Sequence, residues 1–109
     1  MSLKNDLYTY RVTWSEEDRE YLALCSEFPG LSWLAESQEL ALRGIRELVS
    51  DTIKDMEANK ESVPVPFSVR KYSGKFMVRI PPELHKRLAE LAAEEGVSIN
   101  RLVSARLAK

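Results

Sequence analysis

A short alternation of polar and apolar residues that ends in two prolines constrains this chain more than any other feature. Residues 75–80, KFMVRI, place Phe76, Val78 and Ile80 on one face, which is the period-two pattern of a β-strand. The other face carries Lys75, Met77 and Arg79. Proline does not continue a strand, and no second strand pattern follows before the end of the sequence. The sequence therefore predicts a strand whose partner lies elsewhere.

Two helical patterns follow this strand, and the three elements together are too short to fold alone. Pro82 suits the first position of a helix, Gly96 suits its end, and Ser98 is a predicted cap of the second helix. The apolar stripes are Leu84, Leu88, Leu91 and Ala92, then Ile99, Leu102, Val103 and Leu107. Chains below about 40 residues usually need a disulfide, a metal or a partner. Because Cys25 is the only cysteine and no metal cluster is evident, we expect a second copy of the chain.

Two such arms would pair as an antiparallel ribbon with one buried and one exposed face. The expected dimer interface consists of Phe76, Val78, Ile80, Leu84, Leu88, Leu102 and Val103. A two-stranded ribbon fits the DNA major groove, where outward side chains reach base edges. Arg79 and Lys75 are the predicted base contacts, whereas the thioether of Met77 offers only an apolar contact.

The remaining DNA contacts are expected outside the ribbon. Ser98 and Ile99 open a helix whose free N–H groups and positive dipole end can hold a phosphate. Arg101 and Lys71 flank the predicted interface and are expected to contact phosphates as well. These residues would position the arm on DNA without reading its sequence.

The earlier part of the chain predicts a small sheet covered by one helix. Residues 7–14, LYTYRVTW, and residues 21–26, YLALCS, have the composition of two strands around a polar turn. Residues 31–34 supply a short third strand after the turn FPG. Ser37 is a predicted helix N-cap, and an apolar stripe follows it as far as Met56. The expected fold class is α+β, with one helix packed on an antiparallel sheet.

Charge is distributed unevenly along the sequence. Residues 1–69 contain 7 basic and 13 acidic side chains, a balance of −6, and residues 70–109 contain 9 and 4, a balance of +5. The second part is thus suited to nucleic acid and the first is not. No apolar run reaches the roughly 20 residues of a membrane span, and the N-terminal residues lack the apolar core of a signal peptide. We therefore expect a cytoplasmic protein without membrane contact.

Two stretches resemble known families. Residues 75–107, KFMVRIPPELHKRLAELAAEEGVSINRLVSARL, resemble the ribbon-helix-helix fold of the MetJ/Arc class of repressors. Residues 10–42, YRVTWSEEDREYLALCSEFPGLSWLAESQELAL, resemble the HicB antitoxin domain, a trimmed RNase H-like fold. Together with the junction YSGKF they make the chain similar to a HicB antitoxin over almost its full length. The sequence departs from the family at Arg19, where a glycine is common after the acidic turn.

This resemblance implies a domain organisation and a function. It implies a HicB-like toxin-binding domain in residues 1–66, a linker in residues 67–74 and a ribbon-helix-helix domain in residues 75–109. The implied function is that of an antitoxin in a type II toxin–antitoxin system. It would silence a HicA-like RNA-cleaving toxin and repress its own operon at operator DNA. The chain itself would form a homodimer or a higher oligomer.

The toxin-binding surface is expected on the acidic first part of the chain. A protein that holds RNA carries positive charge, which an acidic surface complements. Aromatic residues are favoured as interface anchors. The candidates are Trp14, Tyr21, Phe28 and Trp33, although core packing accounts equally well for each of them.

Two other functions remain open. A ribbon-helix-helix regulator whose first domain senses a small ligand would share the C-terminal pattern. A nuclease or other hydrolase would use the acidic turn Glu16, Glu17 and Asp18, but adjacent turn residues point in different directions and no second carboxylate cluster completes a two-metal site. His85 has no evident partner, and Cys25 lies in an apolar strand. We therefore expect no catalytic residue, no metal site and no cofactor.

Overall fold

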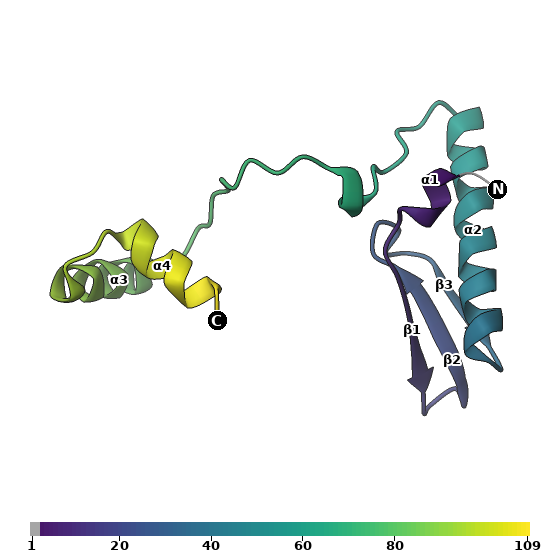
Figure 1. Ribbon diagram of the computed structural model, residues 1–109, viewed down its shortest axis with the longest axis horizontal. Helices are drawn as coiled ribbons and strands as arrows, with labels where there is room; N and C mark the ends of the chain where they lie inside the picture. Colours follow the sequence, from purple (N-terminus) through teal and green to yellow (C-terminus); the bar gives the residue numbers. More distant parts are fainter. Residues whose placement is uncertain (1–2) are drawn as a thin grey trace. The chain divides into compact units, whose positions relative to one another are not determined.

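The computed structural model describes residues 3–109, and their side chains from residue 5 onward. The chain divides into two compact units, Met1–Tyr72 and Ser73–Lys109. The first unit contains α1 (Leu3–Asp6), β1 (Tyr10–Ser15), β2 (Glu20–Cys25), β3 (Ser32–Ala35), α2 (Gln38–Ala58) and a short 3₁₀ helix, η1 (Phe67–Val69). The second unit contains α3 (Pro82–Glu95) and α4 (Ile99–Leu107) (Figure 1).

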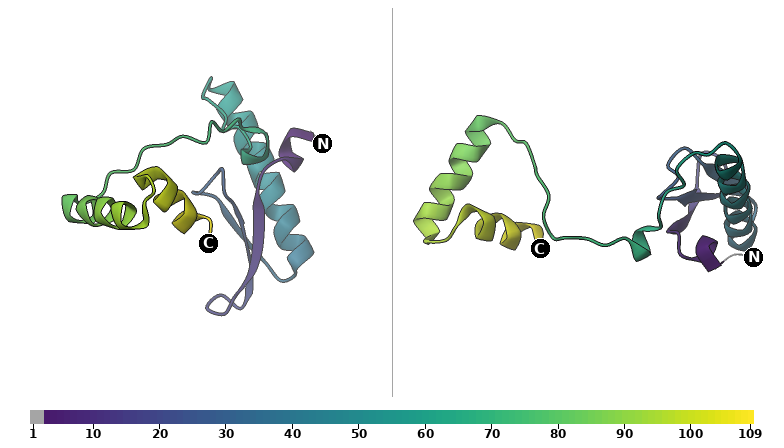
Figure 2. Two further views of the ribbon diagram at one scale, coloured as in Figure 1. Left: turned by 60° about the vertical axis from the view of Figure 1, so that its left-hand side comes forward. Right: turned by 90° about the horizontal axis from the view of Figure 1, so that it is seen from above.

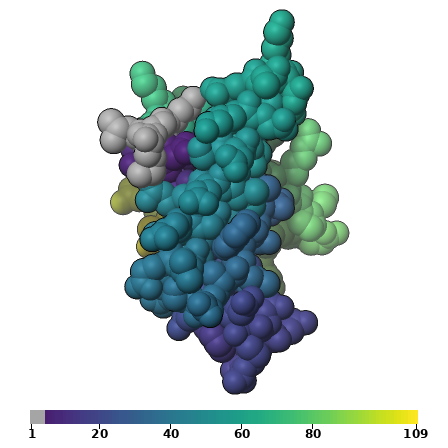
Figure 3. Space-filling model, turned by 90° about the vertical axis from the view of Figure 1, so that its right-hand side faces the viewer, coloured from purple at the N-terminus to yellow at the C-terminus, as the bar shows by residue number. Residues whose placement is uncertain are grey.

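The strands of the first unit form one antiparallel sheet in the order β1–β2–β3. Val12 on β1 lies opposite Ala23 on β2, which in turn lies opposite Trp33 on β3. α2 packs along one face of this sheet, as the right-hand view of Figure 2 shows. Figure 3 looks onto α2, with the tip of the β1–β2 hairpin extending past the N-terminal end of the helix. The expected α+β fold of sheet and packed helix is confirmed for this unit.

The core of the first unit lies between α2 and the inner face of the sheet. Its largest fully buried side chains are Ile45 and Val49 of α2 and Cys25 of β2. α2 begins where the sequence predicts, because the hydroxyl oxygen of Ser37 accepts a hydrogen bond from the backbone N–H of Leu40 at 3.2 Å. The helix therefore presents its apolar stripe to the strands from its first turn onward.

Close packing beside Trp33 requires a glycine in α2. A Cβ placed on Gly44 would lie 2.0 Å from Nε1 of the Trp33 indole, a distance that two such atoms cannot adopt. The indole covers the bare backbone of the helix at this point, while 44% of Trp33 stays exposed to solvent. Gly44 is thus needed for the contact between α2 and β3, despite the low helix propensity of glycine.

The β1–β2 turn contains a backbone conformation that favours glycine. Arg19 has φ 57°, in the left-handed region, and its N–H donates to the carbonyl oxygen of Ser15 at 2.8 Å. The Ser15 hydroxyl donates to the carboxylate of Asp18 at 2.9 Å, and the Arg19 guanidinium pairs with Glu16 at 2.8 Å. Arg19 therefore adopts, with strain, a backbone conformation that glycine would adopt freely.

A buried carboxylate joins three segments of the first unit. Glu27 follows β2 and is only 6% exposed. It accepts hydrogen bonds from the backbone N–H of Thr9 at 3.0 Å, from the Thr9 hydroxyl at 3.2 Å and from the backbone N–H of Phe67 at 2.9 Å. The start of β1, the end of β2 and the segment after α2 therefore meet at one side chain.

Part of the expected linker, residues 67–74, is hydrogen-bonded to the first unit. Besides the bond from Phe67 to Glu27, the Ser68 hydroxyl donates to the carbonyl oxygen of Leu7 at 2.7 Å. Before this segment, the Tyr8 hydroxyl donates to the carbonyl oxygen of Pro64 at 2.7 Å. The first unit consequently extends to Tyr72, well beyond the expected boundary at residue 66. Sequence patterns missed this because the hydrogen bonds connect residues about 40 to 60 positions apart.

The second unit is a pair of helices with the predicted boundaries. α3 begins at Pro82 and ends at Glu95, and the capping residue Gly96 has the left-handed φ of 68° that glycine adopts without strain. Ser98 caps α4, since its side-chain oxygen accepts from the N–H of Arg101 at 3.1 Å. Between α3 and α4, Ala92 is 3% exposed and Leu102 is 4% exposed.

Two short elements differ from the sequence-based expectation. α1 and η1 were not predicted, because each is shorter than the window in which apolar periodicity can be read.

Residues 75–80 run as an extended segment and, within the described residues 3–109, belong to no sheet. The expected partner of that strand is a second copy of the chain, so its pairing stays a prediction.

Candidate functional site

The extended segment before α3 exposes both of its faces. Phe76 is 77% exposed, Val78 is 63% exposed and Ile80 is 36% exposed. On the alternate face, Lys75, Met77 and Arg79 are exposed as well. Three large apolar side chains at alternating positions are thus exposed to water, which is typical of a surface that binds another molecule.

The helix pair of the second unit is also incompletely buried. Leu84 is 39% exposed, and Leu88 and Val103 are half-buried, so the predicted interface positions at these residues remain accessible in the single chain. Leu102 differs, because packing between α3 and α4 already buries it within one chain. Leu102 is therefore a core residue of the unit and not, in the single chain, an open interface position.

The predicted phosphate contacts lie in different surroundings. Ser98 acts as the cap of α4, and Ile99 behind it is half-buried. Arg101 is exposed in the first turn of the same helix, next to the backbone N–H groups that a phosphate would meet. Lys71 is exposed but belongs to the first unit, so only the residues of α4 share one element.

The aromatic candidates of the first unit fall into two groups. Trp14 is 47% exposed and makes an edge-to-face contact with the half-buried Tyr21, their ring centroids 5.1 Å apart. Trp33 is nearly as exposed as Trp14, above Gly44. Phe28 is 7% exposed and packs edge-to-face on Tyr8 in the core, which agrees with the alternative of core packing that the sequence left open. A phenylalanine next to Pro-Gly does not reveal from sequence which side of the turn it fills.

The acidic turn is occupied by contacts within the hairpin. Glu16 pairs with Arg19, and Asp18 accepts from Ser15. Among the residues that the structure describes, no group of three or more His, Cys, Asp or Glu side chains is arranged to hold a metal ion. The carboxylates of this turn therefore have a structural explanation as turn-forming groups.

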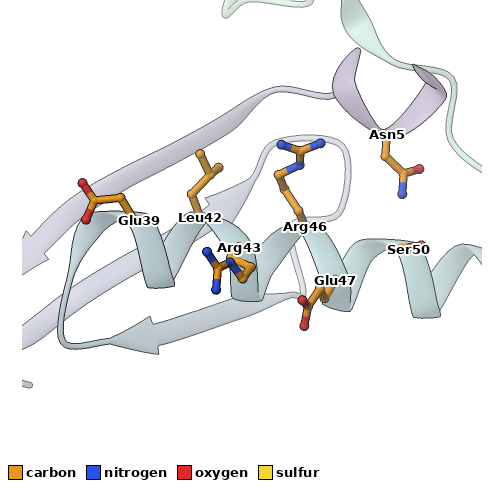
Figure 4. Close-up of a pocket in the computed structure, with 7 residues that line it drawn as sticks. All are labelled: Asn5, Glu39, Leu42, Arg43, Arg46, Glu47 and Ser50. Atoms are coloured by element: carbon orange, nitrogen blue, oxygen red, sulfur yellow. The ribbon is translucent and has the colours of Figure 1, made fainter. Parts of the chain in front are cut away.

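A hollow lies on the surface of the first unit between α1 and α2 (Figure 4). Arg46 extends from α2 towards α1 and forms an ion pair with Asp6, while Asn5 points from α1 back towards the helix. The remaining lining residues, all on α2, are Glu39, Leu42, Arg43, Glu47 and Ser50. Four of the seven lining residues carry charged side chains, namely Glu39, Arg43, Arg46 and Glu47, yet most of the lining surface is apolar.

Two titratable groups in the core have shifted pKa values. Burial raises the pKa of the Cys25 thiol to about 11, which keeps it protonated and unreactive at neutral pH. Burial would also raise the pKa of Glu27, but hydrogen bonds from the backbones of Phe67 and Thr9 outweigh this effect and lower the pKa below its usual 4.5. Glu27 was not singled out from the sequence, although an acidic residue between an apolar strand and the turn FPG was a usable signal.

Comparisons with known proteins bear mainly on the later part of the chain. No helix among the described residues is both long and apolar enough to cross a bilayer. The chain has no significant match among curated proteins and none among solved structures. Residues 56–107 match the model of the HicB family, from the last turn of α2 to the last residue of α4. This part of the chain is therefore similar to the HicB family, which is consistent with the role of an antitoxin.

Proposed function

We propose that this chain is the antitoxin of a type II toxin–antitoxin pair and that it represses its own operon. The observation that carries the proposal is the exposed face of Phe76, Val78 and Ile80 immediately before two capped helices. An extended segment with this pattern buries its apolar face when it pairs with a second copy. The resulting ribbon-helix-helix dimer presents Lys75, Met77 and Arg79 of both chains to the major groove.

The first unit is the proposed binding surface for a HicA-like RNA-cleaving toxin. Up to Tyr72 this unit has 9 basic and 13 acidic residues, whereas the second unit has 7 and 4. An acidic surface attracts the basic surface with which such a toxin holds RNA. The exposed pair Trp14 and Tyr21 supplies an aromatic anchor at the hairpin. We propose no catalytic role, since the hairpin carboxylates act in the turn itself.

Operator binding tests the second unit. The full chain should bind DNA from upstream of its own gene with an affinity that falls steeply as salt rises, because phosphate contacts release counterions. Arg79→Ala should weaken binding to the operator by about 1–3 kcal/mol and binding to unrelated DNA much less. Lys86→Ala, which removes an exposed charge from α3, is the matched control. Equal losses on both DNAs for Arg79→Ala would exclude the ribbon as the reading element.

Co-purification tests the first unit. The product of a neighbouring gene for a small basic protein should co-purify with the full chain and should cleave RNA only when this chain is absent. Trp14→Ala should weaken that complex by about 2 kcal/mol if Trp14 is an anchor. Tyr72→Ala is a suitable control because Tyr72 is 68% exposed and lies outside the sheet. A complex insensitive to Trp14 would move the proposed surface away from the hairpin.

A ligand-sensing regulator is the second candidate, and the hollow between α1 and α2 is the observation that favours it. Under this alternative, a small molecule would bind at Leu42 and Arg43 and alter operator affinity. Leu42→Trp would fill the hollow and abolish that response without affecting a toxin complex. Absence of any neighbouring gene for a basic protein would favour this alternative over the antitoxin.

A further inference from the structure

The face of the sheet opposite α2 is not covered by another element. Among the helices and strands of the described residues, α2 alone packs along the sheet. The Tyr10 hydroxyl donates to the carbonyl oxygen of Asn5 in α1 from the same face as α2. Residues directly opposite in an antiparallel pair share a face. The register therefore defines an outer face, which consists of Arg11, Thr13 and Ser15 of β1, Glu20, Leu22 and Leu24 of β2, and Ser32 and Leu34 of β3.

The centre of this outer face is apolar. Leu22 lies opposite Thr13 on one side and opposite Leu34 on the other, so these three residues form a central row across the strands. Leu34 is 40% exposed, and Leu22 and Leu24 are half-buried. Leucine side chains adjacent to one another on an open sheet face gain stability when another apolar surface covers them.

Opposite charges lie at the two ends of the same face. Arg11 lies opposite Leu24 in the row at one end, and Glu20 lies opposite Ser15 in the row at the other. The two end rows are four residues apart along β1, or about 13 Å. In the described part of the chain, neither Arg11 nor Glu20 takes part in an ion pair. The face is thus positive at one end, apolar in the middle and negative at the other.

We propose that the outer face is a self-association surface and that its partner is the outer face of a second copy. A two-fold axis that runs across the strands along the central row superposes Leu22 and Leu34 on their own copies. The same axis places Arg11 of each chain at the row that contains Glu20 of the other chain. This contact between opposite charges therefore occurs twice in the pair. The charge pattern is therefore complementary to itself, which a surface built for an unrelated basic partner would not be.

The contact is expected to be weak unless another interaction holds the chains together. Three short strands cover less area than the roughly 800 Å² per partner of a stable interface. Pairing of the C-terminal arms, which belongs to the proposed function, would raise the effective concentration of one first unit around another. The outer faces would then join the two first units of one dimer or link two dimers, with the same residues in contact.

Cross-linking of the full chain tests this contact. In Leu34→Cys, a short bis-maleimide should join two chains, because residue 34 lies close to the two-fold axis. Thr13→Cys, in the same row on β1, should behave alike. Lys54→Cys on the exposed side of α2 measures cross-linking due to arm pairing alone. Native Cys25 is 1% exposed and should react little. Equal yields at positions 34, 13 and 54 would overturn the proposal.

Charge reversal provides the more specific test. In the Leu34→Cys background, Arg11→Glu or Glu20→Arg alone should lower the cross-linked yield about fivefold, since each places like charges together twice. Combining Arg11→Glu with Glu20→Arg should restore the cross-linked yield, because the two charges are exchanged and opposite charges meet again. Failure of the double variant to recover would overturn the two-fold arrangement. If instead the arms did not pair, the unmodified chain would sediment as a monomer at micromolar concentration, which distinguishes failure of the proposed function.

Discussion

The two units of this chain bury their apolar residues to different extents. In the first unit, Ile45 and Val49 are fully buried between α2 and the sheet by contacts within one chain. In the second, Phe76 and Val78 remain more than half exposed. In the helix pair that follows them, only Ala92 and Leu102 are less than one-tenth exposed. The first unit thus completes its core within one chain, whereas the second leaves apolar side chains exposed that the proposed partner chain would cover.

The largest expected effect is on the second unit. Val78→Asp places a carboxylate where the ribbon would bury it, so the dimer dissociation constant should rise about 1000-fold, or ~4 kcal/mol. Met77→Asp is the matched control, because Met77 is even more exposed in the single chain yet faces away from the proposed interface. Sedimentation velocity distinguishes the two. Equal weakening by both variants would contradict the assignment of the two faces.

The next effect concerns the first unit alone. Ile45→Ala should lower its free energy of unfolding by about 3 kcal/mol, through lost burial and the cavity that remains. Both tryptophans of the chain, Trp14 and Trp33, lie in this unit, so their fluorescence during urea unfolding reports on it selectively. Leu42→Ala on the same helix, which removes a partly exposed side chain, should cost less than about 1 kcal/mol. Dimerisation through the arm should survive both changes.

The buried carboxylate of Glu27 should contribute a pH-dependent part of this stability. Its pKa is lowered in the folded state, so its contribution is complete above the usual value of 4.5 and is lost as the pH falls from there through the folded-state pKa. Glu27→Gln should cost about 2 kcal/mol at pH 7, because an amide accepts fewer of the hydrogen bonds from Thr9 and Phe67. It should also flatten this dependence of stability on acid. Urea unfolding at pH values from about 3.5 to about 7, on both sides of the usual carboxyl pKa, measures this effect.

The smallest expected effect is at the β1–β2 turn. Arg19→Gly should raise stability by about 0.5–1 kcal/mol, since glycine adopts the φ of 57° without strain. Loss of the exposed ion pair with Glu16 offsets little of this gain. Arg19→Ala removes the same ion pair but keeps the strained backbone, so it should not be stabilising. A gain for alanine as large as that for glycine would show that the ion pair, and not the backbone, matters.

The local features of the chain were predictable from sequence. Ser37, Gly96 and Ser98 end or begin helices where their side chains or backbones suit those positions. Capping depends on a few neighbouring residues, so a sequence pattern carries the whole signal. The pairing of the first two strands also follows from alternation and turn residues.

The environment of the aromatic candidates was not predictable in the same way. Phe28 and Trp14 are both aromatic residues close to turns, yet one lies in the core against Tyr8 and the other stays half in solvent. Gly44 similarly has no local reason to be glycine until Trp33 is seen above it. Burial depends on contacts between segments far apart in sequence, which periodicity does not encode.

The amino-acid pattern thus established the three strands of the first unit, the three longer helices with their caps, and the alternation of apolar residues at positions 75–80, because each depends on nearby residues. Three-dimensional packing alone revealed that Glu27 ties Phe67 to the first unit and that Leu102 is buried without a partner. It also placed Arg11 and Glu20 at opposite ends of one open sheet face. These features depend on which distant residues meet, and that is a property of the folded chain.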